Sequence, residues 1–374
     1  MSSKYIIVGG TDLSNELIEL GGDGIKKCYQ CGTCTAICPL SKEQTTRVRR
    51  MIKKIQLGLE EEVLGDPTPW LCYFCGDCNE TCPKDAAPGN IMDAVRKYQI
   101  INYSIGKFAK VFYNKAYALA SLVIMTIIGL IGMYIFHGEM ATNVVDMDKL
   151  IENFIPSKIL HDAGLVLLAY VIIVMVVHIA NMYRYTKRAI GYGKSAPLSK
   201  WISEFFRVLI KEALLQSRLL CEEGQSARYF AHIGAIWGFI LLFAATGVHF
   251  ISGSFGLGVP EIVPRVIGII GGIGLLYGGI FYLVRRFEKK ELYAKASHLH
   301  DWWLLSLALG SVISGFLTTI FMYANMAMAT YIFYGIHLLF VFYLIVSAPF
   351  SKLVHAIYRP FALWFASVWE GEEL

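Results

Sequence analysis

The sequence predicts an all-α protein with a small cysteine-rich helical head and a bundle of six membrane-spanning helices. Three observations lead to this prediction. Eight of the nine cysteines fall into two matching runs near the N-terminus. Long apolar segments begin near residue 117 and alternate with basic segments. The chain is 55% hydrophobic and only 17% charged, whereas a soluble domain carries roughly 25% charged residues.

Both cysteine runs have the spacing C-x2-C-x2-C-x3-C-P. In two-cluster ferredoxins, three cysteines of such a run bind one [4Fe–4S] cluster, and the fourth binds the other cluster. We therefore predict two clusters whose ligands are exchanged between the runs. The ligands are Cys28, Cys31, Cys34 and Cys82 for the first cluster, and Cys72, Cys75, Cys78 and Cys38 for the second.

Other uses of these cysteines fit the pattern less well. Tetrahedral zinc also takes closely spaced cysteines, but it does not need four of them followed by proline, twice. Disulfides are not expected, because thiols held for a metal belong in a reducing compartment. Attached c-type haem is excluded, since no cysteine pair is followed by histidine. Cys221 lies outside both runs and is predicted to be an ordinary buried thiol.

The chain divides near residue 110. Residues 1–110 carry both signs of charge, and the segment 41–64 between the cysteine runs has apolar residues at helical spacing. This pattern predicts a helical two-cluster ferredoxin domain. Residues 111–374 form the predicted membrane domain, since a spanning helix needs about 20 mostly apolar residues. Six segments qualify: 117–136, 161–183, 230–251, 263–284, 302–322 and 328–348.

Charges between these segments predict the orientation. The 184–229 and 285–300 segments carry nine and five Lys or Arg residues, whereas the 137–160 segment carries two. Basic connections stay on the cytoplasmic side. The start, MSSKYIIVGG, lacks the pattern of a signal peptide. We expect a multi-pass protein of the inner (cytoplasmic) membrane, with the ferredoxin domain and both termini in the cytoplasm. The net charge of +5 reflects these membrane-flanking residues, so no nucleic-acid partner is expected.

Histidines within the apolar segments are candidate haem ligands, because ionisable residues in a membrane are costly and unattached haem needs two axial nitrogens. Two pairs match in depth: His232 with His355, and His249 with His337. Each pair is predicted to bind one haem b, one haem near the cytoplasm and one near the outside. His178 lies at the inner depth and is an alternative to His232, or a group that supports a ligand.

The outer end of the fourth segment carries charged residues that suit a quinone site. Arg265 would hydrogen-bond a quinone oxygen and Glu261 would take a proton, although anchoring at the membrane interface explains both residues as well. The same segment is rich in glycine, which allows close helix packing or leaves room for a porphyrin.

These residues resemble known redox subunits. The stretches CYQCGTCTAICP, RVRRMIKKIQLGLEEEVL and WLCYFCGDCNETCP resemble the C subunit of heterodisulfide reductases. FAHIG at 230–234, together with His337 and PFSKLVH at 349–355, resembles the E subunit of heterodisulfide reductase and the cytochrome b gamma subunit of nitrate reductases. The resemblance implies haem ligands at His232, His337 and His355. The family's second histidine on the earlier helix corresponds to Leu242 here, so His249 is chosen by depth alone.

The fusion of these two parts resembles the membrane subunit of quinone-interacting membrane-bound oxidoreductase (Qmo) complexes of sulfate reducers. It implies an electron-transfer subunit that links menaquinol, through haem b and two [4Fe–4S] clusters, to heterodisulfide reductase A-like flavin and iron–sulfur subunits. Adenylylsulfate reductase would be a functional partner in sulfate respiration. One alternative is the equivalent subunit of a heterodisulfide- or sulfite-reductase-linked complex. The other is a non-redox membrane anchor or transporter with a structural cysteine head.

Overall fold

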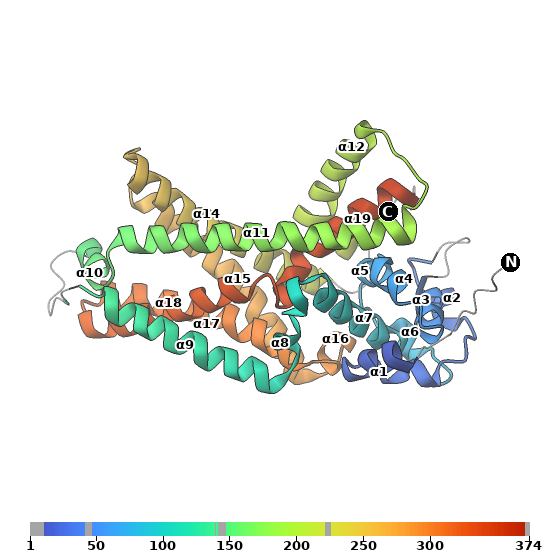
Figure 1. The fold of residues 1–374 in the computed structure, drawn as a ribbon. Coiled ribbons are helices and arrows are strands. Elements are labelled where there is room, and N and C mark those ends of the chain that lie inside the picture. Colours follow the sequence, from blue (N-terminus) through green and yellow to red (C-terminus); the bar gives the residue numbers. More distant parts are fainter. Residues whose placement is uncertain (1–10, 42–46, 139, 141–146, 221–225, 371–374) are drawn as a thin grey trace.

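The described residues form helices joined by turns, without a strand among them. The computed structural model in Figure 1 describes residues 11–41, 47–138, 140, 147–220 and 226–370. A group of short helices lies at one end, and long helices extend away from it (Figure 1). The predicted all-α fold is confirmed. Cys221 lies outside the described residues.

The head consists of short helices around a compact apolar core. Its elements are α1 (Thr11–Glu19), the 3-10 turn η1 (Asp23–Lys27), α2 (Thr33–Ile37), α3 (Arg47–Gln56), α4 (Glu60–Gly65), α5 (Thr68–Leu71), α6 (Asp77–Glu80) and α7 (Pro88–Tyr103). On α3, Met51, Ile52 and Ile55 are fully buried against α1 and α7, while Arg49 and Lys53 lie on the exposed face. This is the helix that the apolar spacing between the cysteine runs predicts.

Among the described residues, six helices are long and apolar enough to cross a membrane. They are α9 (Lys115–Phe136), α11 (Ser157–Ile190), α14 (Ser226–Phe255), α15 (Ile262–Glu288), α17 (Leu299–Tyr323) and α18 (Ala327–Ser347). Five of the predicted segments lie inside these helices, and the sixth overruns α18 by one residue. The length and apolar composition of these helices therefore indicate a multi-pass membrane protein.

Helix α11 is longer than a bilayer requires. Its 34 residues extend about 51 Å at 1.5 Å per residue, whereas the hydrocarbon core is about 30 Å thick. The surplus packs on the head, where α11 meets α4. A side-chain carbon on Gly65 would come within 2.3 Å of the Tyr185 carbonyl oxygen, so glycine lets the two backbones touch. Figure 1 shows α11 running from the far end of the bundle to the head.

The glycines of α15 serve helix packing. A Cβ on Gly278 would lie 2.4 Å from the carbonyl oxygen of Ala231 on α14, and one on Gly271 would lie 2.8 Å from that of Gly238. Helices α14 and α15 therefore approach closely, and α15 also packs on α17, which packs on α18. Of the two uses considered for these glycines, the packing of α14 against α15 accounts for Gly271 and Gly278.

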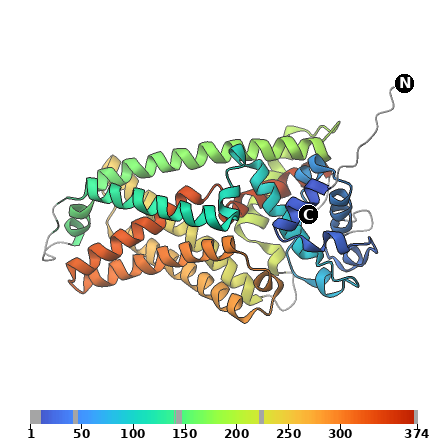
Figure 2. The same ribbon diagram turned by 60° about the horizontal axis from the view of Figure 1, so that its bottom comes forward.

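The C-terminal helix α19 (His355–Glu370) joins the head to the membrane helices. Shorter elements occupy the other connections: η2 (Ile105–Lys107), α8 (Lys110–Tyr113), α10 (Met147–Phe154), α12 (Leu198–Val208), the π-helical turn η3 (Leu209–Leu214), α13 (Ser217–Leu220), α16 (Leu292–Lys295) and η4 (Lys352–Val354). Helix α19 packs against α5 of the head, against α11 and against α12. Figure 2 shows the same arrangement from another side.

Candidate metal centres

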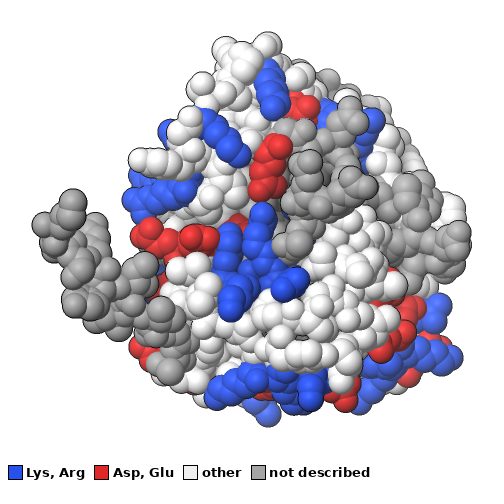
Figure 3. Space-filling view, turned by 90° about the vertical axis from the view of Figure 1, so that its right-hand side faces the viewer, with Lys and Arg blue, Asp and Glu red and all other residues white. Residues whose placement is uncertain are grey.

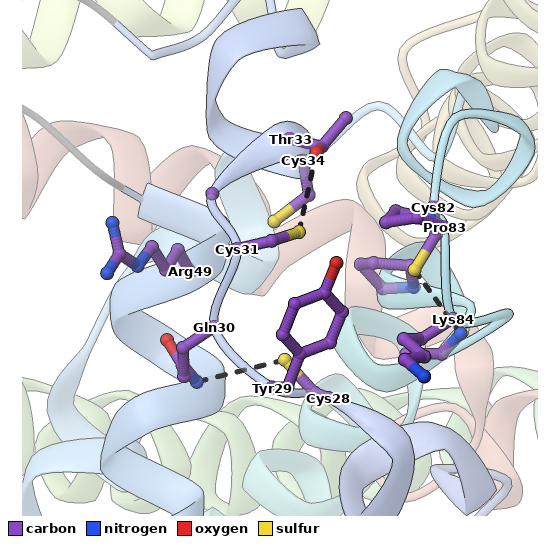
Figure 4. Close-up of a pocket in the computed structure, with 13 residues that line it drawn as sticks. Cys28, Tyr29, Gln30, Cys31, Thr33, Cys34, Arg49, Cys82, Pro83 and Lys84 are labelled. Carbon is purple, nitrogen blue, oxygen red and sulfur yellow. Dashed lines mark hydrogen bonds between the residues drawn. The ribbon is translucent and has the colours of Figure 1, made fainter.

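The structure brings the four cysteines of the first predicted set together around one cavity. Cys28, Cys31, Cys34 and Cys82 all line it, although Cys82 is more than forty residues away in the sequence. Figure 4 shows Cys31 and Cys34 next to each other, Cys82 across from them, and the Tyr29 ring between. The cavity therefore contains the complete donor set that the sequence predicts for one cluster.

The second set gathers in the same way. Cys38 lies beside Cys72, and Cys78 lies beside Cys72, Cys75 and Cys38. Cys34 of the first set is also a neighbour of Cys78, so the two sets are adjacent. The fourth cysteine of each run thus lies with the other run, as the exchange of ligands requires.

Local backbone geometry repeats in the two runs and explains how the cysteines converge. The glycine after the second cysteine has a left-handed backbone in both, with φ of 92° at Gly32 and 110° at Gly76. Gln30 and Phe74, just before the second cysteine, also have positive φ, at 66° and 60°. These turns fold each run back on itself, and a side chain at the glycine positions would strain the backbone.

The thiols of Cys34, Cys75 and Cys78 resist ionisation. Burial raises the pKa of Cys34 to about 11, and the neighbouring Cys28, Cys31 and Cys82 add to the rise. Burial also raises the pKa of Cys75 to about 11 and that of Cys78 further, with Cys72 beside both. Metal ligation requires thiolates, so cations bound among the sulfurs would offset this mutual repulsion. The donor set fits an iron–sulfur cluster.

Backbone amides point at two of the sulfurs. Phe74 N–H donates to Cys72 Sγ at 3.4 Å, and Ala86 N–H donates to Cys82 Sγ at 3.3 Å. Such hydrogen bonds tune the potential of a cluster. Within the described part of the chain, no group of three or more His, Cys, Asp or Glu side chains is arranged to hold a single metal ion. That finding concerns a mononuclear site, because a cubane spreads its four ligands over four iron atoms.

The inner pair of predicted haem ligands lies at the head. His355 begins α19, and His232 of α14 is close enough to influence its pKa. Burial lowers the pKa of His355 well below its usual value, and Arg96, Arg359, Lys352 and His232 lower it further. A neutral imidazole keeps the lone pair that iron needs. His232 donates its Nδ1–H to Gln216 Oε1, which leaves Nε2 for another partner.

The outer pair is arranged differently. His337 donates Nδ1–H to the Ser311 carbonyl oxygen of α17 at 2.8 Å, which leaves its Nε2 available. His249, about half exposed, lies beside other groups: its ring centroid is 5.8 Å from that of His161, and its Nδ1 is 3.4 Å from Glu261 Oε2. These neighbours do not join His249 to His337, so the pairing of the two histidines stays a prediction.

The residues proposed for quinone contact lie next to His249. Glu261 precedes α15 and Arg265 lies in its first turn, with Arg265 N–H donating to the Glu261 carbonyl oxygen at 3.4 Å. Their side-chain roles stay predictions. His178, the alternative inner ligand, is fully buried, and its Nε2 accepts from Ile105 N–H at 3.2 Å. That bond joins η2 to α11, and the alternative role of His178 stays a prediction.

Sequence reasoning missed the contacts between the second cysteine run and the membrane helices. The Trp70 ring is fully buried, with its centroid 5.7 Å from that of His355. Arg359 donates to the Cys72 carbonyl oxygen at 3.4 Å, and Arg228 donates to the Tyr73 carbonyl oxygen at 3.2 Å. The signal was present in the sequence: each arginine lies four residues from a predicted haem ligand.

A second group of charges lies where the head meets the membrane helices. Asp93 and Lys97 of α7 form an ion pair at 2.8 Å. Asp301 of α17 pairs with Lys352 and, at 3.5 Å, with Arg286. Asp301 and Lys352 both influence the pKa of Asp93, so the pair on α7 lies near the charges around Asp301. Burial would raise the pKa of Asp93, but Lys97 and Lys352 outweigh it and lower the pKa to about 2.

Comparisons with known proteins agree with this two-part architecture. Residues 24–86 match the family described as a 4Fe-4S dicluster domain. Residues 116–370, more than half of the chain, match the family described as citrate utilization protein B. The chain belongs to the citrate utilization protein B family. The family's name assigns no substrate to this chain. No solved structure matches it.

Relatives match each part of this family member separately. The N-terminal part is 42% identical over 60 residues to the C subunit of the H(2):CoB-CoM heterodisulfide,ferredoxin reductase of Methanothermobacter marburgensis, covering 16% of this chain and 32% of the relative. It is 38% identical over 92 residues to a protein of Archaeoglobus profundus described as like the C subunit of heterodisulfide reductase, covering 24% and 49%. These matches span at most about half of the length of either relative.

The C-terminal part matches a different polypeptide of such reductases. It is 29% identical over 179 residues to the E subunit of the dihydromethanophenazine:CoB--CoM heterodisulfide reductase of Methanosarcina acetivorans, covering 42% of this chain and 64% of the relative. The chain is therefore a fusion of a heterodisulfide reductase C-like part with a heterodisulfide reductase E-like part. Its cysteine head is a 4Fe–4S dicluster domain.

Proposed function

We propose that this chain is the membrane subunit of a redox complex and carries electrons between menaquinol and soluble flavin and iron–sulfur subunits. The observation that carries the proposal is the buried contact between His355 of the membrane part and Trp70, which is two residues from Cys72. It joins the predicted haem site to a complete cysteine set. The complex would supply electrons for the reduction of adenylylsulfate in sulfate respiration, as Qmo complexes do.

The residues present fit the cofactors. Cys28, Cys31, Cys34 and Cys82 would hold one [4Fe–4S] cluster, and Cys72, Cys75, Cys78 and Cys38 the other. His232 and His355 would hold an inner haem b, and His249 with His337 an outer one. Bound there, these groups supply one-electron transfer. The chain's own part is to fix their spacing and to exclude water from them.

The orientation follows from charge. The basic segments between membrane helices contact the head: Arg228 donates to Tyr73, and Leu292 of the 285–300 segment packs on Gly76. Head and basic segments therefore share one side, which the positive-inside rule makes the cytoplasm. Soluble partners, adenylylsulfate reductase among them, would meet the chain on that side.

Quinol would react at the opposite end, near Glu261 and Arg265. Arg265 would hold a quinone oxygen, and a carboxylate beside it suits release of a proton to the outside. We expect Arg265→Ala to lower the rate of quinol oxidation at least about tenfold, since a hydrogen bond to a charged donor contributes about 1.5–3 kcal/mol. Dithionite reduction of haem is the control. An unchanged quinol rate removes Arg265 from the site.

One experiment tests the whole proposal. An anaerobic difference spectrum of the purified, cofactor-replete chain is recorded before and after a menaquinol analogue is added. We expect reduced b-type haem bands with quinol. If haem bands appear with dithionite but not with quinol, the proposed quinol contact or the proposed direction of electron flow is wrong. No haem bands with either reductant would refute the histidine assignments and favour a membrane anchor.

The relatives' names favour a second candidate. Both parts match subunits of heterodisulfide reductases, so the same electron path would serve a heterodisulfide-linked complex. The two candidates differ in their soluble partner. Cross-linking in native membranes, followed by identification of the bound flavoprotein, separates them: a heterodisulfide reductase A-like flavoprotein beside adenylylsulfate reductase supports the first, and a heterodisulfide-reducing flavoprotein supports the second.

A further inference from the structure

The two cysteine runs have different surroundings. The second run faces the membrane part: its Cys72 carbonyl oxygen accepts from Arg96 of α7 and Arg359 of α19. The Arg359 guanidinium also lies 5.1 Å from the centre of the Tyr73 ring. A Cβ on Gly76 would meet Leu292 of α16 at 3.2 Å. This run is covered by α14, α16 and α19.

The first run is held by hydrogen bonds within the head itself. Gln30 donates to Gln56 Oε1 at 2.9 Å, and Gln56 donates to the Cys28 carbonyl oxygen at 2.8 Å. Its outward side is open: Cys31 is exposed, the Tyr29 side chain is 56% exposed and Ile37 is 44% exposed. A redox group held here lies at the surface of the head, on the side away from the membrane contacts.

The rim of this opening is positive. The charged side chains that line the cavity are Arg49 and Lys84, with Lys84 Nζ 5.6 Å from the centre of the Tyr29 ring. Both cations are exposed, and the exposed Lys53 lies one turn along α3 from Arg49. Figure 3, which views the head end, shows Lys and Arg side chains in groups there, with acidic side chains between them.

We propose that the surface formed by Tyr29, Cys31, Arg49 and Lys84 is the docking face for the soluble electron-accepting subunit. That partner would present carboxylates around its own redox group. Tyrosine and arginine are enriched at interfaces, and opposite charges steer such partners together. The second cysteine set would then receive electrons from the membrane part, and the first would pass them on. This inference rests on the proposed function.

Small oxidants of opposite charge test the face without the partner. The cofactor-replete full chain is reduced with dithionite, and its oxidation is followed by stopped flow with ferricyanide or with hexaamminecobalt(III). Each reduced cluster gives one electron, and the oxidant's metal ion falls from the trivalent to the divalent state. The variant R49E/K84E reverses the rim charge. The control K107E/K110E reverses two exposed cations at η2 and α8, on the membrane side of the head.

We expect R49E/K84E to slow oxidation by ferricyanide about tenfold at low salt, to speed oxidation by the cobalt complex, and to lose both effects at high salt. The control should leave both rates unchanged. Equal effects of the two variants, or no effect of either, would overturn the proposal. Dithionite reduces the clusters without quinol, so a chain that quinol cannot reduce can still show the charge effect at the docking face. Failure of the docking proposal and failure of the proposed function therefore remain distinguishable.

Electron paramagnetic resonance gives a second readout, in which broadening is measured on the unaltered chain and a variant serves only to assign the signals. A soluble anionic dysprosium complex should broaden the signal of the cluster at the first set, which is identified as the signal that Cys31→Ser changes. Greater broadening of the other signal would contradict the proposal. If the detergent-solubilised chain is a dimer and R49E/K84E dissociates it, the face binds a second copy of this chain. That outcome would also contradict the proposal.

Discussion

Replacing Trp70 by alanine should separate the head from the membrane part both structurally and functionally. Trp70 is fully buried, and its ring packs against two residues of α19, with centroid distances of 5.7 Å to His355 and 5.6 Å to Tyr358. Truncation of a buried tryptophan to alanine costs about 3–5 kcal/mol through lost burial and the cavity left behind. A loss of about 3 kcal/mol corresponds to a more than hundredfold change in an equilibrium constant, at about 1.4 kcal/mol per factor of ten.

The assay is anaerobic unfolding of the detergent-solubilised chain in guanidinium, followed by bleaching of the cluster absorbance. Trp70→Phe is the matched control, because it retains an aromatic ring and leaves a smaller cavity, so it should lose less stability than Trp70→Ala. The dithionite-reduced spectrum of both variants reports whether the haem proposed at His355 is retained. If Trp70→Ala loses less than about 1 kcal/mol, or no more than Trp70→Phe, then this contact does not hold the head in place.

Three further predictions concern other parts of the chain. Burial would raise the pKa of Asp66, but Lys54, Arg50 and a bond from Thr68 N–H lower it below its usual value. Asp66→Asn should therefore cost about 3 kcal/mol at pH 7 in the same unfolding assay, because it breaks a buried ion pair. The difference from wild type should begin to shrink as the pH falls below about 4 and should vanish only below the folded pKa. Gly278→Ala should lower the thermal midpoint of the bundle by circular dichroism, because its Cβ would lie 2.4 Å from a carbonyl oxygen, whereas Gly268→Ala, with 3.8 Å to its nearest neighbour, should not. Cys38→Ser should alter the same cluster signal as a substitution in the second run, and a change confined to the other signal would refute the exchange of ligands.

The pH prediction for Asp66 follows from linkage. Its carboxylate is stabilised in the folded chain, so the folded pKa lies below the unfolded one. Its contribution is present above the unfolded pKa and is lost as the pH falls through the folded pKa. A wild-type stability that does not fall relative to the asparagine variant in acid would show that Lys54 and Arg50 do not hold the charged form.

The sequence by itself determined the parts that depend on local spacing. The cysteine intervals predicted the dicluster head, since three donors within seven residues can reach one cluster only through a tight turn, and Gly32 and Gly76 supply that turn. Apolar length predicted the six helices, because each must span the same bilayer. The buried face of α3 likewise followed from helical periodicity.

Tertiary structure alone decided which distant residues meet. Local spacing does not reveal how far α11 runs past the membrane, or that α19 folds back onto α5 and brings His355 to Trp70. Depth along the helix was the basis for choosing His249, whereas packing sets that ring beside His161 and Glu261. Spacing along a helix fixes depth and face, but the rotation and neighbours of each helix depend on the packing of all the others. The contrast between the covered second cysteine run and the exposed first run arises in the same way.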